Sequence, residues 1–166
     1  MAGTPQEQAK LARRWLRDDD PEWSEFTQRW MAFNALYDTV RQPNQPEADA
    51  IHRTVIKYFD QNTAGRCLKK IDQRDVRALF RVPPGDCRYA SGDPRFRRMT
   101  SQLVATFGAS ADDIERLSCL MRVVYQVRCN LVHGSKDPAI RRDQRLVSVC
   151  TPIVDVVVRE LIRLMK

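Results

Sequence analysis

Apolar residues recur every three or four positions over long stretches of this chain, and this periodicity constrains its fold more than any other feature. The clearest stretch runs from Ile114 to Leu131, and its apolar positions also include Leu117, Leu120, Met121, Val124 and Val127. This spacing places the apolar side chains on one face of an α-helix. Even the β-branched run 154–158 fits a helical register, and no segment alternates in the way a strand does. The sequence therefore predicts an all-α fold.

Several further helices are predicted on both sides of this stretch. Apolar faces indicate a helix over 6–17, one with an aromatic stripe from Trp23 to Tyr37, one over about 47–59, and helical pieces within 62–81. Residues 110–113 suit a helix start. Asp137 and Pro138 open a last helix that Pro152 should kink or split. We expect a bundle of about five to seven helices.

The longest irregular segment is predicted between residues 81 and 94, where proline and glycine cluster. It is rich in arginine: Arg88 lies within it, and Arg95, Arg97 and Arg98 follow. One interpretation is a solvated insertion loop, because loops gather charge for solubility alone. The other is a basic flap that binds nucleic acid along the path to a site.

Composition indicates a single soluble domain over residues 1–166, because 43% of the residues are hydrophobic and 30% are charged. No apolar run approaches the roughly 18 residues of a membrane span, and the first residues lack a secretory signal, so we expect a cytoplasmic protein. The five cysteines are scattered, with no C-x-x-C pair and only two histidines. We therefore expect reduced thiols, no metal and no cofactor. The net charge of +7 is compatible with RNA or DNA as a partner.

Arg128 interrupts the apolar stripe of its own helix, four residues after Val124, and His133 follows five residues later. A half-buried arginine needs a partner, so Arg128 is either structural or functional. An arginine can bind phosphate with its forked donors, and a histidine can transfer protons near neutral pH. Together they supply the charge stabilisation and the acid–base chemistry that phosphodiester cleavage without a metal needs.

The spacing of this pair does not suit a single helix face. Five residues correspond to about 140° around a helix and about 7.5 Å along it. Two arrangements could bring the groups together. The helix could end at Val132, with Gly134 as a left-handed cap that turns His133 round. Alternatively, a two-fold homodimer could build one site from both chains.

At these residues the chain resembles a known family. The Arg-x4-His-Gly pattern from Arg128 to Gly134, with Asn130 inside it, is similar to the signature of HEPN domains. The earlier segment Trp30-Met31-Ala32-Phe33-Asn34-Ala35-Leu36-Tyr37 resembles a stretch of several bacterial HEPN subfamilies, and the two segments occur in the right order. The resemblance covers roughly residues 20–165.

The resemblance implies an all-α, usually dimeric protein that is often a metal-independent endoribonuclease. His133 would then be the general base or acid, Arg128 would bind the scissile phosphate, and Asn130 would orient the phosphate or His133. The substrate would be RNA, cleaved through its 2′-hydroxyl.

The resemblance leaves a second function open, because many HEPN members are inactive binding or scaffold modules. Active members commonly have Asn, Asp or His directly after the arginine, whereas this chain has Cys129. A non-catalytic module would bind RNA or a partner such as a nucleotidyltransferase or antitoxin, in a defence or toxin–antitoxin system. An Arg128 buried against an acid of its own chain would favour that function.

Overall fold

The computed structural model describes residues 4–6, 9, 13, 25–133 and 141–166, and it gives the backbone alone for Val132, His133 and residues 141–144. In this part of the chain all regular structure is helical, and seven α-helices are present. The predicted all-α bundle is confirmed. The predicted helix over 6–17 and the helix start at Asp137 and Pro138 lie wholly or largely outside the described residues.

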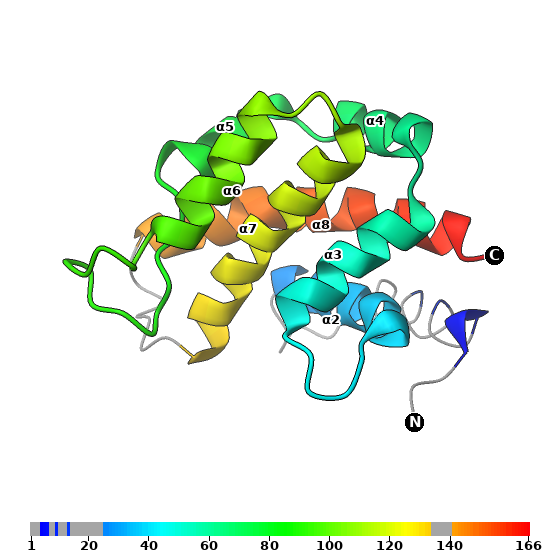
Figure 1. Cartoon of the computed structure of the whole chain (residues 1–166), viewed down its shortest axis with the longest axis horizontal. Coiled ribbons are helices and arrows are strands. Elements are labelled where there is room, and N and C mark those ends of the chain that lie inside the picture. Colours follow the sequence, from blue (N-terminus) through cyan, green and yellow to red (C-terminus); the bar gives the residue numbers. More distant parts are fainter. Residues whose placement is uncertain (1–3, 7–8, 10–12, 14–24, 134–140) are drawn as a thin grey trace.

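The helices are labelled as in Figure 1. They are α2 (Glu25–Tyr37), α3 (Glu47–Tyr58), α4 (Gln61–Lys70), α5 (Gln73–Arg81), α6 (Arg98–Ala109), α7 (Asp113–His133) and α8 (Arg141–Leu164), with a short 3-10 helix η1 (Asp38–Val40) after α2. The irregular segment expected at 81–94 spans 82–97, between α5 and α6. Among the described helices, none combines the length and the apolar character needed to cross a bilayer.

Helix α7 forms the centre of the bundle, as the apolar stripe of its sequence predicts. It crosses the molecule between α3 and α6, and it also packs against α4 and α8 (Figure 1). Leu117, Leu120, Met121 and Val124 are fully buried along it. Because α7 packs against several other helices, groups on its face can meet residues that are distant in the sequence.

The aromatic face of α2 is buried, as expected for a core helix. Phe26, Trp30, Phe33 and Tyr37 have at most 3% of their surface exposed. Trp30 reaches α7, where its ring centroid lies 6.1 Å from that of Tyr125. The most extensive packing of α2, however, is against α8 rather than against α7.

The helix starts follow from short polar side chains. Asp60 and Thr63 form a reciprocal capping box at the start of α4. Asp72 accepts a hydrogen bond from the Arg74 backbone N–H at 2.8 Å at the start of α5. In the segment expected to open α7, the Asp112 carboxylate accepts from the Ile114 N–H at 2.8 Å.

Pro152 does not split the last helix, so that part of the prediction is wrong. Helix α8 is continuous from Arg141 to Leu164 with Pro152 inside it. Proline removes one backbone donor, but its ring lies on the exposed side of the helix. The adjoining Ile153, Val154 and Val157 are fully buried, and their packing against the bundle keeps the helix continuous.

Candidate functional site

Arg128 lies near the end of α7 and is held by an acidic residue of another helix. Its Nη1 atom is 3.3 Å from Oε2 of Glu47, and the two side chains are 22% and 16% exposed. Glu47 is the first residue of α3. The expectation that an arginine within an apolar stripe needs a partner is therefore confirmed. Only Nη1 contacts the carboxylate, so the pair is not the bidentate fork that arginine can form.

Two tyrosine hydroxyls complete the surroundings of Glu47. The Tyr37 hydroxyl is 2.8 Å from Oε1 and also 2.6 Å from the side-chain oxygen of Asn34. The Tyr125 hydroxyl is 3.2 Å from Oε2. We call Asn34, Tyr37, Glu47, Tyr125 and Arg128 the Glu47 cluster. It joins α2, α3 and α7, and it links the two sequence segments on which the family resemblance rests.

Burial and charge keep the protons of this cluster on its hydroxyl groups. Burial, reinforced by the Glu47 carboxylate, raises the pKa of Tyr37 well above its ordinary value. Burial also raises the pKa of Tyr125, and hydrogen bonding to Cys129 adds to the rise. Both hydroxyls are therefore donors at neutral pH. The Glu47 carboxylate is therefore bound by the two hydroxyls as well as by Nη1 of Arg128.

Cys129, which follows Arg128, does not supply a thiolate. Burial raises its pKa, against the smaller opposing effects of the hydrogen bond with Tyr125 and the charge of Arg128. A protonated thiol is a weak nucleophile and a poor metal ligand. Cys129 is therefore a packing neighbour of the Glu47 cluster rather than a reactive group.

His133 is the last residue of α7. The helix extends one residue beyond Val132, where the first arrangement predicted above had it end. The cap at Gly134 and the orientation of His133, on which that arrangement depends, lie outside the described residues. In a continuous helix, Arg128 and His133 stay about 140° apart. The side chain of His133 lies outside the described residues. The dimeric arrangement of the site stays a prediction.

Asn130 is buried, and its amide group connects α7 to the segment 82–97. Its Nδ2 donates to the Gly85 carbonyl at 2.7 Å. Its Oδ1 accepts from Gln126 Nε2 at 3.0 Å and from the Cys87 backbone N–H at 3.3 Å. Both ends of the amide therefore hold segment 82–97 against the end of α7.

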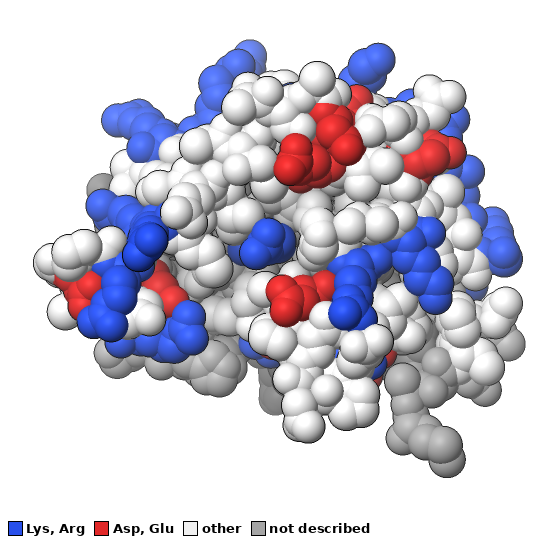
Figure 2. Space-filling model, in the orientation of Figure 1, with Lys and Arg blue, Asp and Glu red and all other residues white. Residues whose placement is uncertain are grey.

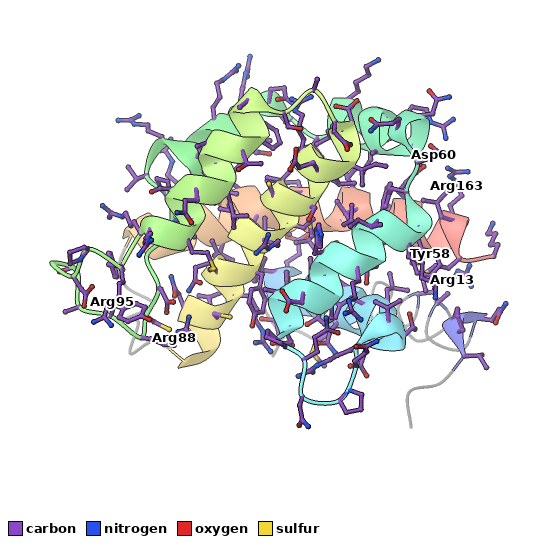
Figure 3. The ribbon with its side chains drawn as sticks, viewed as in Figure 1. Arg13, Tyr58, Asp60, Arg88, Arg95 and Arg163 are labelled. Atoms are coloured by element: carbon purple, nitrogen blue, oxygen red, sulfur yellow. The ribbon has the colours of Figure 1, made fainter. Side chains whose placement is uncertain are left out.

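The arginines proposed as a basic flap fall into two groups. Arg88 and Arg95 lie on segment 82–97 (Figure 3), and each pairs with a nearby aspartate: Arg88 with Asp86 at 2.6 Å and Arg95 with Asp93 at 2.7 Å. The Arg88 guanidinium lowers the pKa of Asp86. Figure 2 shows this mixture of positive and negative side chains at the tip of the segment.

Arg97 and Arg98 form the second group, and in the described structure neither has an acidic partner. The Arg97 guanidinium lies 5.4 Å from the centroid of the Phe96 ring. Arg98 is exposed at the start of α6. These two arginines therefore carry the uncompensated positive charge of the proposed flap.

The second histidine, His52, lies on α3 and is not a member of the Glu47 cluster. Its Nδ1 is 2.7 Å from the hydroxyl of the buried Ser118 on α7. Burial lowers the pKa of His52, and the nearby Arg122 lowers it further. His52 is therefore neutral at pH 7 and serves as a hydrogen-bonding contact between α3 and α7.

Sequence reasoning missed Glu47, Tyr37 and Tyr125 as members of the site. Glu47 lies in the first turn of a helix, where an acidic residue is expected because it interacts favourably with the helix dipole. Its position therefore gives no sign of a further role. Tyr37 belongs to an aromatic core stripe. Tyr125 offers a signal, since it precedes Arg128 by three residues and so shares its helix face.

The fold and site together define an all-helical bundle in which the Glu47 cluster holds Arg128 near the end of the central helix α7. Comparisons of the chain with known protein families, with curated proteins and with solved structures found no match. Within the described residues, no group of three or more His, Cys, Asp or Glu side chains is placed to hold a metal ion.

Proposed function

We propose that this chain is a HEPN-like, metal-independent endoribonuclease that works as a homodimer. One observation carries the proposal: Glu47 holds Arg128 by a single guanidinium nitrogen, at the same end of α7 as His133. Apart from a hydrogen bond with the Cys129 thiol, the other donors of the fork are left to bind the scissile phosphate. A guanidinium fixed before the substrate arrives stabilises developing negative charge without further reorganisation.

The reaction follows from these groups. His133 of one chain removes the proton from the 2′-hydroxyl, whose oxygen attacks the neighbouring phosphorus. The bond from phosphorus to the 5′-oxygen breaks, and a second His133 from the other chain donates the proton that the leaving oxygen takes up. Arg128 binds the non-bridging oxygens as charge builds on them. The products are a 2′,3′-cyclic phosphate and a free 5′-hydroxyl.

Glu47 is a positioning residue in this proposal, since it acts through Arg128. The hydroxyls of Tyr37 and Tyr125 share its charge and limit how strongly it neutralises the guanidinium. Asn130 fixes the loop 82–97 against the end of α7 that carries Arg128. These contacts hold the arginine in one orientation.

The second candidate function is a non-catalytic module that binds RNA or a protein. The same ion pair favours it, because an acid of the chain itself, Glu47, partly neutralises the charge of Arg128. The protonated Cys129 directly after the arginine points the same way. In this function, Arg128 stabilises the junction of α3 and α7, and the partner is an RNA, a nucleotidyltransferase or an antitoxin of a defence system.

An RNA cleavage assay in EDTA separates the two functions. The wild type should release 2′,3′-cyclic phosphate ends, and His133→Ala should lower the rate on the order of 10²–10⁴-fold. His52→Gln removes the only other histidine and should leave the rate within about threefold. Glu47→Gln should lower the rate while leaving RNA binding intact. If the wild type binds RNA but cleaves none, the non-catalytic function is the better one.

A further inference from the structure

The outer side of α3 carries Ile56, which is the most exposed large apolar side chain of the described residues, with 55% of its surface accessible. Its neighbours Ile51 and Val55 are fully buried on the inner side of the same helix. Ile56 therefore points away from the core. A single exposed apolar residue is common on the surface of a protein, so Ile56 alone does not indicate a binding site.

The surroundings of Ile56 distinguish it from an isolated apolar residue. It borders an open depression of about 380 Å³, whose other lining residues are Val40 of η1 and Arg53 and Lys57 of α3. We call these four residues the α3 patch. Arg53, Ile56 and Lys57 are three and four positions apart, so they share one helix face. Apolar and positive side chains therefore meet at one surface depression.

The two cations of the α3 patch are uncompensated in the described part of the chain. No acidic side chain lines the depression. Asp38 of η1 pairs with Arg41, and the Lys57 ammonium lies 5.1 Å from the centroid of the Tyr58 ring. Figure 2 shows positive side chains along α3 and negative ones at its first turn. Electrostatic attraction at the patch therefore favours an acidic partner.

The lining of the depression favours a protein over a nucleic acid. None of the four lining residues is aromatic, so a base has no ring there on which to stack. Phosphate contacts alone would leave Val40 and Ile56 uncovered. An apolar side chain of a protein can enter the depression and cover both, and the apolar area removed from water stabilises the complex.

We propose that the α3 patch docks an acidic amphipathic helix of a protein partner. One apolar side chain of that helix fills the depression against Val40 and Ile56. Acidic residues three or four positions to either side of it share its helix face and pair with Arg53 and Lys57. A contact of this size is typical of weak, transient complexes. The proposal does not rest on ribonuclease activity, because no residue of the Glu47 cluster belongs to the patch.

Fluorescence anisotropy of the full chain with a labelled peptide tests the proposal. The peptide has about 15 residues, which allows it to form a helix. It has one central leucine, glutamates four positions before and after the leucine, and alanine and glutamine elsewhere. It should bind with a Kd below about 1 mM. A second peptide, with lysines in place of the glutamates, should bind at least about tenfold more weakly.

Two substitutions separate the apolar and the charged contributions. Ile56→Ser removes the apolar contact without adding a charge, and the position is exposed, so the fold should be retained, as circular dichroism will verify. It should weaken the glutamate peptide at least about fivefold. Arg53→Ala should weaken it at least about threefold, because it removes a charge opposite a glutamate. The double variant Arg53→Glu/Lys57→Glu should lose the glutamate peptide and bind the lysine peptide instead.

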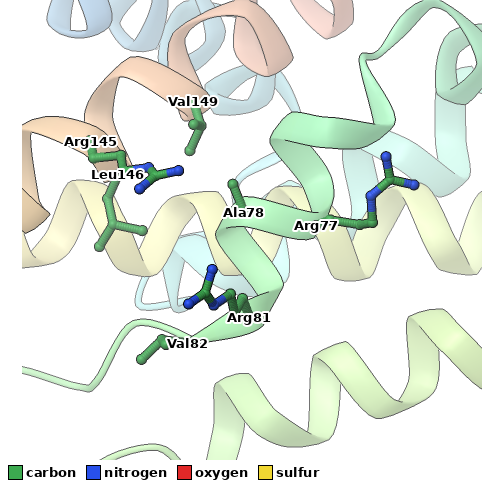
Figure 4. A pocket seen from close by; sticks show the side chains of 7 residues that line it. All are labelled: Arg77, Ala78, Arg81, Val82, Arg145, Leu146 and Val149. Atoms are coloured by element: carbon green, nitrogen blue, oxygen red, sulfur yellow. The ribbon is translucent and has the colours of Figure 1, made fainter.

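The matched control is Arg81→Ala, which removes an exposed arginine from another positive depression. This depression lies between α5 and α8, where Arg77, Arg81 and Arg145 line it (Figure 4). The control should change the Kd of the glutamate peptide less than about twofold.

Three results would overturn the proposal. The first is a glutamate peptide that does not bind at millimolar concentration. The second is an Arg81→Ala variant that loses as much affinity as Arg53→Ala does, because the attraction would then be to positive charge in general. The third is a single-stranded RNA that loses as much affinity as the peptide on Ile56→Ser, which would assign the patch to a nucleic acid.

Discussion

The Nη1 atom of Arg128 lies 3.3 Å from Oε2 of Glu47, and this contact joins the end of α7 to the first residue of α3. The two residues are 81 positions apart in the sequence. Both side chains are largely removed from water, so the pair is screened less than a surface ion pair. Two tyrosine hydroxyls also depend on the same carboxylate.

Glu47→Ala should therefore destabilise the fold by about 1–3 kcal/mol, because it leaves a half-buried guanidinium without its acid and removes one acceptor from each of two tyrosine hydroxyls. Chemical denaturation followed by circular dichroism measures this loss. Glu25→Ala is the matched control, since Glu25 pairs with Arg29 but is 68% exposed. It should cost less than about 0.5 kcal/mol. Equal effects of the two substitutions would contradict a structural role for the Glu47 cluster.

The helices could be predicted from the sequence because each depends on local information: apolar spacing, a capping aspartate, and a proline or glycine at the boundary. The Glu47 cluster depends on contacts between α2, α3 and α7, which span up to 81 residues. No local pattern specifies which acid meets Arg128. At Pro152 the local sequence is misleading. Proline predicts a break, but the packing of Ile153 and Val154 keeps α8 continuous.

Gly85 should be intolerant of any side chain. A Cβ atom at this position would overlap the Phe96 ring, which must then leave its place. We expect Gly85→Ala to cost about 1–3 kcal/mol, as overpacking does elsewhere. Gly92→Ala, in the same segment, meets nothing within 4 Å and should stay within about 0.5 kcal/mol of the wild type. Thermal unfolding of the two variants makes the comparison, and a neutral Gly85→Ala would show that the segment is not packed as described.

The loop 82–97 should also loosen when Asn130 is truncated. Asn130→Ala removes the acceptor of the Cys87 backbone N–H and the donor to the Gly85 carbonyl. Hydrogen exchange at the Cys87 amide should become faster, and stability should fall by about 1–3 kcal/mol. The Asp93 amide, which donates to the Ala90 carbonyl within the loop, is an internal reference. Unchanged exchange at Cys87 would contradict the anchoring role.

His52 should make the stability of the protein depend on pH. Its pKa is below the ordinary value of 6.5, mainly because of burial and also because of Arg122; Asp49 and Glu115 oppose this, and Ser118 hydrogen-bonds to the ring. As the pH falls through 6.5, the unfolded chain binds a proton at His52 more readily than the folded chain does. The contribution of the neutral His52 to the free energy of unfolding is therefore complete above that pH and is lost progressively below it.

The expected result is a melting temperature that falls between pH 7 and pH 5. His52→Gln keeps a hydrogen-bonding side chain but cannot be protonated, so its melting temperature should fall less over the same range. His133→Ala is the control, as it removes the other histidine of the chain. Parallel pH profiles for the wild type and His52→Gln would exclude His52 as the source. The carboxylates with lowered pKa, such as Asp86 and Glu160, titrate at lower pH and do not overlap this window.

RNA binding, if it follows the basic flap, should depend on Arg97 and Arg98 more than on Arg88 and Arg95. The aspartates beside Arg88 and Arg95 compensate their charge, so a phosphate must compete with Asp86 and Asp93. Arg98 has no such competitor in the described structure. We expect Arg98→Ala to weaken the binding of a short single-stranded RNA several-fold and to reduce the slope of log K against log salt by about 0.7. Arg88→Ala should weaken binding less and should reduce the slope less.

Fluorescence anisotropy between 50 mM and 200 mM salt measures the affinities and the slopes together. An affinity that does not change with salt, or a larger loss for Arg88→Ala than for Arg98→Ala, would show that the RNA does not bind along this segment.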